Sequence, residues 1–334
     1  MSESGVPRLE LGIVGLGHIG GNLALHALEG RIRVVGSSRR PPRQELLQAG
    51  LIDAGPVARL PDSLASRPRR ILLYVPAGAT VDQVLDALIP NLEPGDIVAD
   101  GGNSYWKDSR ARWRRLRARG LHFLDAGTSG GIEGARQGAC FMVGGEKAPV
   151  AAFEPILRSL AADGGYVHAG PPGAGHFTKL VHNGIEFGML QAIGEGVGLL
   201  KRYGDELDLR GILEAWRHGS VIRSWLIELL ARQYSERGGM EEVSPYVEDT
   251  GEVNWLVSDA LRMEVPIPVI SQAVMQLFAS RDGDRYWARA IAMMRNGFGG
   301  HPLGPDEEIR TLRHTARLSD AQELANEDGE PARH

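Results

Sequence analysis

Three glycines near the amino terminus constrain the fold more than any other feature of the sequence. Gly15, Gly17 and Gly20 form a Gly-x-Gly-x-x-Gly run that follows an apolar segment at residues 9–15 and precedes a helix-compatible segment at residues 21–28. Such glycines permit a tight turn and let the backbone approach a pyrophosphate at the helix N-terminus. A glycine turn without a ligand is the alternative, and the strand-turn-helix context argues against it.

The segments that follow alternate between strand and helix patterns. Short apolar segments at residues 31–36, 71–75 and 96–99 are typical of buried strands, whereas residues 80–89 have helical periodicity. Such alternation predicts a parallel sheet with helices on both faces. We therefore expect an α/β Rossmann-type, doubly wound N-terminal domain.

The pattern changes after a breaker cluster at residues 169–173, Ala-Gly-Pro-Pro-Gly. Beyond it strand patterns almost vanish, and long helical patterns predict an all-α C-terminal domain. The helices are expected at residues 175–203, 208–235, 252–263, 268–279 and 284–296. The domains are expected at residues 1–170 and 171–304, followed by a polar, disordered tail at residues 305–334.

Composition excludes several classes of protein. The 334 residues carry a net charge of -5, which argues against nucleic acid as the main partner. No segment is apolar enough to span a bilayer, so no membrane is expected as a partner. The histidines are scattered without metal-ligand spacing, so no metal site is expected. One cysteine excludes an internal disulfide, and with no signal peptide recognised we expect a cytoplasmic protein.

Two further features have an ordinary structural interpretation. Cys140 stands among apolar neighbours and is expected to be a buried small hydrophobe rather than a nucleophile. The basic run at residues 110–119 is interpreted as the solvated face of an amphipathic helix.

The end of the second expected strand indicates which cofactor is used. A carboxylate at this place binds the ribose 2′-hydroxyl of NAD, but the run here is Gly36-Ser37-Ser38-Arg39-Arg40. Arginine offers a planar fork that matches phosphate oxygens. We therefore expect NADP, held at its 2′-phosphate by Ser38, Arg39 and Arg40. NAD use, with the two arginines flanking a solvated turn, is the alternative.

Four polar side chains share one face of the first long helix of the C-terminal domain. Lys179, His182, Asn183 and Glu186 are spaced i, i+3, i+4 and i+7, which places them on one helix face. A lysine whose pKa is lowered by burial or by a nearby cation can accept a proton, and a glutamic acid can return one. We expect Lys179 and Glu186 to be catalytic in a cleft. A surface helix with an ion pair is the alternative.

Four blocks of sequence together resemble the decarboxylating 6-phosphogluconate dehydrogenases, in the short-form branch of the β-hydroxyacid dehydrogenase superfamily. The blocks are residues 15–22 (GLGHIGGN), 100–104 (DGGNS), 127–135 (GTSGGIEGA) and 179–186 (KLVHNGIE). The second and fourth blocks are specific to this family, whereas other β-hydroxyacid dehydrogenases look similar in the first and third. The resemblance runs unevenly from about residue 9 to residue 302.

The resemblance implies an oxidoreductase that converts 6-phosphogluconate to ribulose 5-phosphate and CO2. Lys179 would take the proton of the C3 hydroxyl and then stabilise the enediol, and Glu186 would protonate that enediol at C1. The residues implied at the cofactor are Gly15, Leu16, Gly17, His18, Ile19, Gly20, Val75, Pro76, Ala77 and Asn103. The residues implied at the sugar acid are Asn103, Ser129, Gly130, Gly131, His182, Asn183, Arg223, Arg295 and His301.

The resemblance also implies an assembly. In the family the Arg-(five residues)-His run, here Arg295 to His301, reaches the active site of the other subunit, so we expect a homodimer or homotetramer. For Arg223 a structural salt bridge is an equal alternative.

Two departures from the family pattern concern the substrate phosphate. Phe187 stands where long forms have a tyrosine, and residues 251–256 (GEVNWL) lack the cation and the hydroxyl of the corresponding family segment. The same chemistry on an unphosphorylated sugar acid such as gluconate, or on a related 3-hydroxyacid, is therefore an alternative. A non-catalytic protein that senses NADPH is a further alternative, against which the full polar stripe argues.

Overall fold

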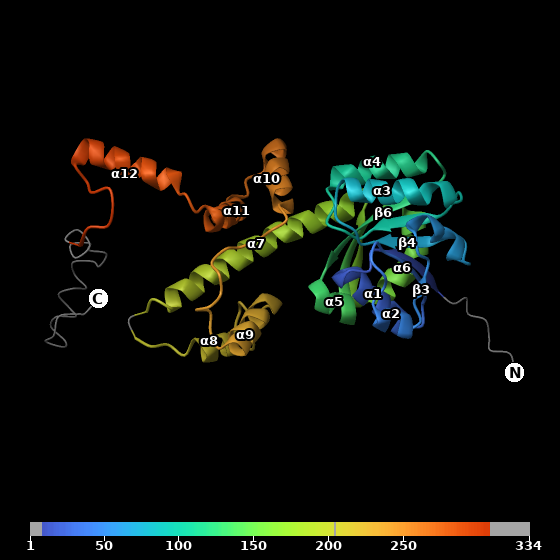
Figure 1. The fold of residues 1–334 in the computed structure, drawn as a ribbon, viewed down its shortest axis with the longest axis horizontal. Coiled ribbons are helices and arrows are strands. Elements are labelled where there is room, and N and C mark those ends of the chain that lie inside the picture. Colours follow the sequence, from blue (N-terminus) through green and yellow to red (C-terminus); the bar gives the residue numbers. More distant parts are fainter. Residues whose placement is uncertain (1–8, 204, 308–334) are drawn as a thin grey trace. The chain divides into compact units, whose positions relative to one another are not determined.

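A single mixed sheet organises the amino-terminal part of the computed structural model, which describes residues 9–203 and 205–307. Its strand order is β3-β2-β1-β4-β5-β6-β7-β8 (Figure 1). The strands are β1 (Glu10–Val14), β2 (Arg33–Ser37), β3 (Ile52–Asp53), β4 (Arg70–Leu73), β5 (Ile97–Asp100), β6 (His122–Ser129), β7 (Ala139–Gly144) and β8 (Ala161–Gly170). Strand β1 pairs in parallel with both β2 and β4, so the chain crosses over from one side of β1 to the other.

Helices cover both faces of this sheet. They are α1 (His18–Glu29), α2 (Gln44–Gln48), α3 (Ala79–Leu88), α4 (Trp106–Arg117), α5 (Gly131–Gln137) and α6 (Lys147–Leu160), with 3-10 turns η1 (Val57–Arg59), η2 (Pro61–Ser63) and η3 (Ile89–Asn91). Leu72 of β4 belongs to a core with α1 and α6, while its neighbours Ile71 and Leu73 belong to a second core with α3 and α4. This alternation follows from the two-residue period of a strand and gives three layers.

The α/β Rossmann-type, doubly wound fold expected from the sequence is confirmed, with one difference in the sheet. Strand β7 runs antiparallel to β6, and β8 runs parallel to β7. The strand patterns did not predict β6, β7 or β8. Strand β6 ends in Asp-Ala-Gly-Thr-Ser and β8 holds two adjacent glycines, so neither has the apolar run that indicates a buried strand.

The all-α part begins with α7 (Ala174–Leu200) and continues through α8 (Leu209–Trp216), α9 (Trp225–Arg237), α10 (Glu252–Met263), α11 (Pro268–Arg281) and α12 (Tyr286–Gly299). The single helix expected at residues 208–235 is wrong, because α8 and α9 are separate helices. Ser224 accepts a hydrogen bond from the backbone N–H of Ile227 at 3.3 Å and thereby caps a new helix. The remaining helices begin and end close to the expected residues.

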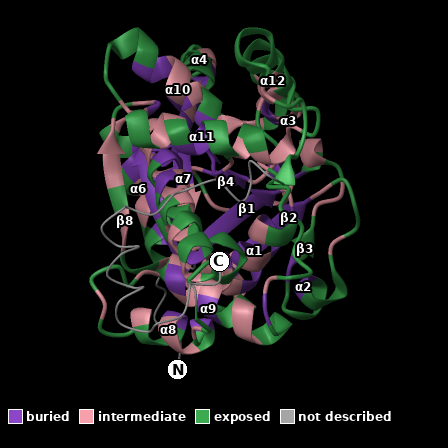
Figure 2. Cartoon of the chain, turned by 90° about the vertical axis from the view of Figure 1, so that its left-hand side faces the viewer, coloured by how far each residue is buried: buried purple, intermediate pink, exposed green. Residues whose placement is uncertain are grey.

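Contacts divide the chain into two compact units. The first holds Met1–Phe187 and Asp249–Ser271, and the second holds Gly188–Glu248 and Gln272–His334. The division lies inside α7, whereas the domain boundary expected at residue 170 falls where β8 ends. Figure 2 shows buried residues gathered along strands such as β1 and exposed residues along α12. The tail expected at residues 305–334 lies, from residue 308 onward, outside the described residues.

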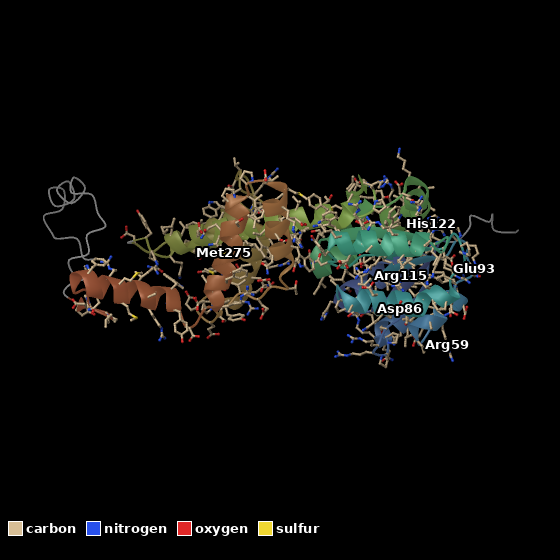
Figure 3. The ribbon with its side chains drawn as sticks, turned by 90° about the horizontal axis from the view of Figure 1, so that it is seen from above. Arg59, Asp86, Glu93, Arg115, His122 and Met275 are labelled. Atoms are coloured by element: carbon tan, nitrogen blue, oxygen red, sulfur yellow. The ribbon has the colours of Figure 1, made fainter. Side chains whose placement is uncertain are left out.

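The basic run on α4 is only partly solvated, which corrects one expectation. Arg112 is 3% exposed and donates to Asp82 of α3 at 2.9 Å. Arg115, labelled in Figure 3, pairs with Asp86 of the same helix α3. Arg112 is buried because its guanidinium reaches acceptors on α3, which the spacing within α4 does not show.

The expectation that Cys140 is buried is wrong. Its side chain is exposed on β7, opposite Ser129 of β6, whereas Ala139 and Phe141 are buried. Successive side chains of a strand point to opposite faces, so apolar sequence neighbours do not imply burial of the residue between them.

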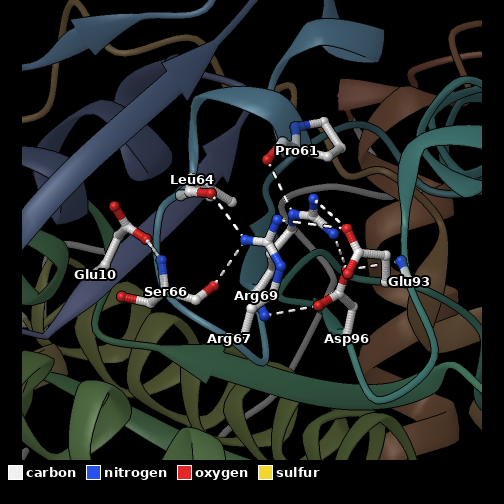
Figure 4. A network of polar contacts seen from close by, with 8 residues as sticks. All are labelled: Glu10, Pro61, Leu64, Ser66, Arg67, Arg69, Glu93 and Asp96. Carbon is white, nitrogen blue, oxygen red and sulfur yellow. Dashed lines mark hydrogen bonds and ion pairs between the residues drawn. The ribbon is translucent and has the colours of Figure 1, made fainter.

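A buried ion pair lies before β4 and β5, at the amino ends of these strands (Figure 4). Arg69 donates to Asp96 at 2.7 Å, to Glu93 at 3.0 Å and to the carbonyl of Pro61 at 3.0 Å. Asp96 in turn accepts the backbone N–H of Arg69 at 2.7 Å. Every polar group of this pair therefore has a partner.

Within residues 9–203 and 205–307, no helix combines the length and the apolar character that crossing a membrane requires. In the same residues no three His, Cys, Asp or Glu side chains gather as metal ligands would.

Candidate functional site

A cavity of about 1130 Å³ opens where β1, β2 and β4 end. Nine residues that the sequence assigned to the cofactor line it: Gly15, Leu16, Gly17, His18, Ser38, Arg39, Arg40, Val75 and Pro76. The residues Ile19, Gly20, Ala77 and Asn103, assigned with them, are not among its lining. A cavity of this size at the carboxyl ends of parallel strands suits a dinucleotide.

The three glycines of the turn have different physical roles. A side chain on Gly15 would place its Cβ 2.1 Å from the carbonyl oxygen of Tyr74, and one on Gly20 would lie 2.0 Å from that of Gly15. A Cβ on Gly17 would meet nothing within 4 Å. Gly17 is the N-cap residue of α1, and no side chain there accepts a hydrogen bond from the first backbone N–H groups of the helix. Gly15 and Gly20 are therefore required by packing, while Gly17 leaves open space beside helix N–H groups that favour an anion.

A third arginine belongs to the expected phosphate end of this cavity. Arg43 lines it together with Arg39 and Arg40, which come from the turn between β2 and α2. Arg43 was not among the residues expected at the cofactor, although the run Arg-Arg-Pro-Pro-Arg could have indicated it. Ser37 fixes this turn by donating its hydroxyl to the carbonyl of Gly55 at 2.8 Å.

A second, much smaller hollow of about 10 Å³ contains the expected catalytic lysine. It is lined by residues of α7, of α10 and of the loop between β5 and α4: Asn103, Ser104, His176, Lys179, Leu180, Asn183, Glu252 and Trp255. The sequence assigned Asn103, Lys179 and Asn183 to the site. It missed Ser104, His176, Glu252 and Trp255 as site residues.

The beginning of α7 is held rigidly against β6. Asp125 is 1% exposed, and its carboxylate accepts the backbone N–H groups of Gly173 at 2.7 Å and His176 at 2.9 Å. A carboxylate at a helix N-terminus satisfies free N–H groups and the helix dipole. A Cβ on Gly127 of β6 would lie 2.5 Å from the Cβ of Lys179, so only glycine allows this close packing. These contacts fix the backbone that carries Lys179.

Lys179 is buried, with 7% of its surface exposed. Burial lowers the pKa of its ammonium, while the charges of Glu186, Cys140 and Glu252 oppose this shift. Its Nζ lies 3.5 Å from Nδ1 of His182. Among the described residues no carboxylate lies within ion-pair distance of Lys179. The amine is therefore available as a base nearer to neutral pH than an exposed lysine.

His182 connects the lysine to the rest of the expected stripe. Its Nε2 lies 3.0 Å from Oγ of Ser129, and its Nδ1 lies 3.2 Å from Oδ1 of Asn183 and 3.8 Å from Oε2 of Glu186. Burial lowers the pKa of the imidazole, and the nearby charge of Lys179 lowers it further. Lys179, His182, Asn183 and Glu186 thus lie together along α7 as the spacing predicts.

The DGGNS loop is ordered by a buried aspartate. Asp100 accepts the backbone N–H of Gly102 at 3.0 Å and the hydroxyl of Ser104 at 2.7 Å. Arg112 lies 3.7 Å from the same carboxylate. The loop thereby presents Asn103, whose amide donates to Glu252 at 3.3 Å.

Helix α10 is anchored at the same place although it lies far along the chain. Asp259 is buried and accepts hydrogen bonds from the Tyr105 hydroxyl at 2.8 Å and the Trp106 indole at 2.7 Å. Although burial alone would raise the pKa of this carboxyl, these donors hold it below its ordinary value. The anchor places Glu252 within 3.5 Å of the Asn183 amide.

The remaining expected substrate residues fall into two groups. Gly130 and Gly131 follow Ser129 in the first unit, both with positive φ. The residues Arg223, Arg295 and His301 belong to the second unit. That these three join Lys179 in one site stays a prediction.

A glycine turn beside a dinucleotide-sized cavity, and a buried lysine with a lowered pKa in the same unit, define a dinucleotide-dependent dehydrogenase. Two family models match the chain: the NAD binding domain of 6-phosphogluconate dehydrogenase over residues 10–170, and the C-terminal domain of the same enzyme over residues 175–317. The chain belongs to the 6-phosphogluconate dehydrogenase family.

Individual relatives agree with this assignment. The NAD(+)-dependent, decarboxylating 6-phosphogluconate dehydrogenase of Haloferax volcanii is 38% identical over 303 residues, which cover 90% of this chain and all of that protein. The NADP(+)-dependent, decarboxylating enzyme of Bacillus subtilis is 36% identical over 293 residues, which cover 82% of this chain and 61% of that one.

A solved structure of the Plasmodium falciparum 6-phosphogluconate dehydrogenase superposes with a TM-score of 0.75 at 25% identity, covering 94% of this chain and 68% of that chain. That enzyme has been solved in apo form, with its cofactor NADP+ and with its substrate 6-phosphogluconate. The present chain is accordingly an NAD(P)-dependent oxidoreductase of the decarboxylating family, which confirms the resemblance drawn from its sequence.

Proposed function

We propose that the protein oxidises and decarboxylates 6-phosphogluconate to ribulose 5-phosphate with NADP, using Lys179 as the base. The observation that carries the proposal is the burial of Lys179 without a carboxylate partner among the described residues, beside the Asn103 and Asn183 amides. Bound NADP supplies the acceptor for the hydride of C3. The open space at Gly17 fits its pyrophosphate.

The residues of α7 then act in sequence. Neutral Lys179 takes the proton of the C3 hydroxyl as C3 is oxidised, and becomes an ammonium. That ammonium donates to the new C3 oxygen, so it stabilises the negative charge that develops there when the C1 carboxylate leaves as CO2. Glu186, which is half exposed, protonates the carbon that has lost CO2 and completes the product.

The neighbouring polar groups hold the sugar acid. His182 is fixed by Ser129 and Asn183, so its ring keeps one orientation toward the substrate. Backbone N–H groups at Ser129, Gly130 and Gly131 suit an anionic carboxylate. Asn103, which lines the same hollow as Lys179, binds a substrate hydroxyl.

The arginines beside Ser38 support NADP over NAD. Arg39→Ala is expected to raise the KM for NADP and leave that for NAD unchanged, because a charge-assisted hydrogen bond to phosphate is worth about 1.5–3 kcal/mol. Arg43→Ala should act in the same direction, since Arg43 lines the same cavity. Equal use of NAD and NADP by the wild type contradicts this part of the proposal.

The substrate phosphate requires its own test, because Phe187 and Val253-Asn254 depart from the family pattern, which offers a hydroxyl at the first place and a cation and a hydroxyl in the second segment. We assign the phosphate to Arg223, Arg295 and His301. Steady-state kinetics with gluconate beside 6-phosphogluconate, following CO2 release, decides the question. Comparable kcat/KM for the two acids favours the alternative, an oxidative decarboxylase of unphosphorylated sugar acids.

Assembly into at least a dimer is part of the proposal. Within the described chain, α12 has no buried residue and exposes six large apolar side chains: Tyr286, Trp287, Ile291, Met293, Met294 and Phe298. Such an apolar helix favours burial against a partner subunit. Mixing inactive Lys179→Met and Arg295→Ala subunits should restore part of the activity if Arg295 serves the partner's site. No recovery in mixed oligomers contradicts a shared site.

The chemistry and the single cysteine fit a cytoplasmic enzyme of sugar-acid metabolism, such as the pentose phosphate pathway or gluconate utilisation.

A further inference from the structure

His176 is a buried histidine to which the mechanism above gives no role. It lies in the first turn of α7, is 2% exposed and lines the same hollow as Lys179. Its Nδ1 lies 2.7 Å from Oγ of Ser109 on α4. Its Nε2 is buried and has no hydrogen-bond partner in the part of the chain that the structure describes. Buried polar atoms without a partner are rare, and in an active site they call for a ligand or a water.

The hydrogen bonds of Ser109 determine which nitrogen of the ring carries the proton. The Ser109 hydroxyl donates to the carbonyl of Tyr105 at 3.3 Å, so its oxygen is left to accept. With the single Ser109 hydrogen on the carbonyl of Tyr105, Nδ1 of His176 donates its proton to Ser109, and this is the tautomer that the proposal below uses. In that tautomer of the neutral ring Nε2, which is buried without a partner, is an unprotonated acceptor in a residue that lines the hollow.

The volume of the hollow limits which molecule can donate a hydrogen bond to Nε2 of His176. About 10 Å³ is the volume of one water-sized probe, and far less than a sugar acid requires. The polar groups around it are those of Asn103, Lys179, Asn183 and Glu252, so a water there has the two to four partners that ordered waters need. No direct hydrogen bond joins His176 to Lys179 in the described residues, so a link between them through the hollow requires a bridging molecule.

We propose that one ordered water fills this hollow and that His176 positions Lys179 through it. The water donates one hydrogen to Nε2 of His176 and accepts one from the Lys179 ammonium. The inference rests on the proposed function of Lys179 as base. A bridge of this kind stabilises the ammonium form, which is the form that Lys179 acquires as it takes the substrate proton. His176 is thus a positioning residue that does not itself contact the substrate.

Other charged and titratable groups surround the two residues and stay unchanged in the test. Around Lys179 they are His182 and Glu186 of α7, Cys140 of β7 and Glu252 of α10. Around His176 the Asp125 carboxylate of β6 accepts the backbone N–H.

Two amide variants separate the proposed role from a merely structural one. In His176→Asn the amide reaches the place of Nδ1, so the bond to Ser109 is kept while the acceptor in the hollow is lost. In His176→Gln the amide reaches the place of Nε2, so an acceptor is kept in the hollow while the bond to Ser109 is lost. Thermal unfolding of both variants checks that each is folded at the assay temperature.

The proposal predicts that His176→Asn is the defective variant. Its kcat should fall about tenfold with little change in KM, and the acid limb of its kcat/KM profile should move about one pH unit lower, because loss of an acceptor disfavours the Lys179 ammonium. His176→Gln should recover both quantities toward the wild type. A high-resolution crystal structure of the wild type should show the water within hydrogen-bond distance of Nε2.

The opposite results overturn the inference. If His176→Asn keeps the wild-type profile while His176→Gln loses stability and activity, the histidine has only a structural role. A crystal structure without a water at Nε2 also overturns it. Failure of the proposed function is distinct, since the wild type itself then shows no oxidation of either sugar acid.

Discussion

Two buried cations of the first unit, Arg69 and Lys179, differ in how they are paired. They are similarly buried, with 4% and 7% of their surfaces exposed. Arg69 has two carboxylates within 3.0 Å, whereas Lys179 has none within ion-pair distance among the described residues. Burial disfavours both charges, but the hydrogen bond to Asp96 raises the pKa of Arg69, while the pKa of Lys179 is lowered. Burial alone therefore does not lower the pKa of a cation; burial without a paired carboxylate does, and this is the property that the proposed role of Lys179 requires.

The two cations also lie at different places on the sheet. Arg69 precedes β4 and its partner Asp96 precedes β5, at the amino ends of parallel strands. Lys179 packs on Gly127, toward the carboxyl end of β6. Ligands of open α/β sheets bind at the carboxyl ends, so a charge at the amino ends is free to be neutralised for stability. The paired Arg69 and the proposed base Lys179 thus lie at opposite ends of the parallel strands.

The largest expected effect concerns the unpaired cation. Lys179→Met should lower kcat about 10⁴-fold, about 5.5 kcal/mol in the barrier, because it removes the base and the later proton donor. Steady-state kinetics measures the loss, and NADPH titration by fluorescence should show unchanged cofactor binding. If the variant keeps activity within tenfold of the wild type, another group is the base. Lys179 is then not catalytic, and the proposed mechanism is wrong.

Loss of the paired cation should act on stability instead. Arg69→Met leaves Asp96 buried without its counter-ion, which costs about 3–5 kcal/mol in the free energy of unfolding. Urea unfolding measures this loss, and kcat per folded molecule should stay unchanged. The double change Arg69→Met with Asp96→Leu is the control, and it should recover most of the stability. A large loss of kcat in folded Arg69→Met protein would remove the distinction between the two cations.

A third change tests how Lys179 is held in place. Asp125→Ala removes the carboxylate that accepts the N–H groups of Gly173 and His176, which should cost about 1–2 kcal/mol of stability. It should also lower kcat, because α7 loses its fixed position over Gly127. Asp125→Asn, which keeps one acceptor, is the matched control and should lie between alanine and the wild type. Equal kcat for all three proteins contradicts a role for Asp125 in placing Lys179.

The smallest expected effect is an increase in the free energy of unfolding when Lys179 is replaced. A lowered pKa in the native state means that the unfolded chain holds the Lys179 proton more tightly, so a protonated Lys179 disfavours folding. Lys179→Met should therefore raise the free energy of unfolding by about 1 kcal/mol at pH 7. The gain should shrink as the pH rises toward the ordinary lysine value of about 10.4. Urea unfolding at several pH values checks this, and a loss of stability at pH 7 would show that Lys179 is satisfied as Arg69 is.

Parts of the site that are contiguous in sequence could be predicted, and parts that meet across elements could not. The turn of Gly15 and the stripe from Lys179 to Glu186 follow from helix and strand periods, which are local. His176 belongs to the same helix but was missed, because its partner Ser109 lies on α4. Glu252 was missed as a site residue because its closeness to Asn103 depends on the anchor at Asp259.

The burial of single residues was likewise decided by tertiary contacts. The sequence predicts Arg112 as one of several solvated arginines, yet the buried Asp100 and the partly exposed Asp82 both pair with it, and its side chain is buried. The apolar neighbours of Cys140 predict that it is buried, yet its side chain on β7 is exposed. The types of the neighbouring residues in the sequence indicate the average environment of a residue. Its burial depends on which face of the strand or helix its side chain lies on.

The sequence by itself determined the dinucleotide fold, and it predicted Lys179 as the base and NADP as the cofactor, because each depends on residue types at fixed local spacing. Tertiary structure decided that Lys179 is buried without a counter-ion while Arg69 is not, and that α10 brings Glu252 to the same hollow. The physical reason is that a pKa depends on burial and on charges a few ångströms away, and those charges come from distant parts of the chain.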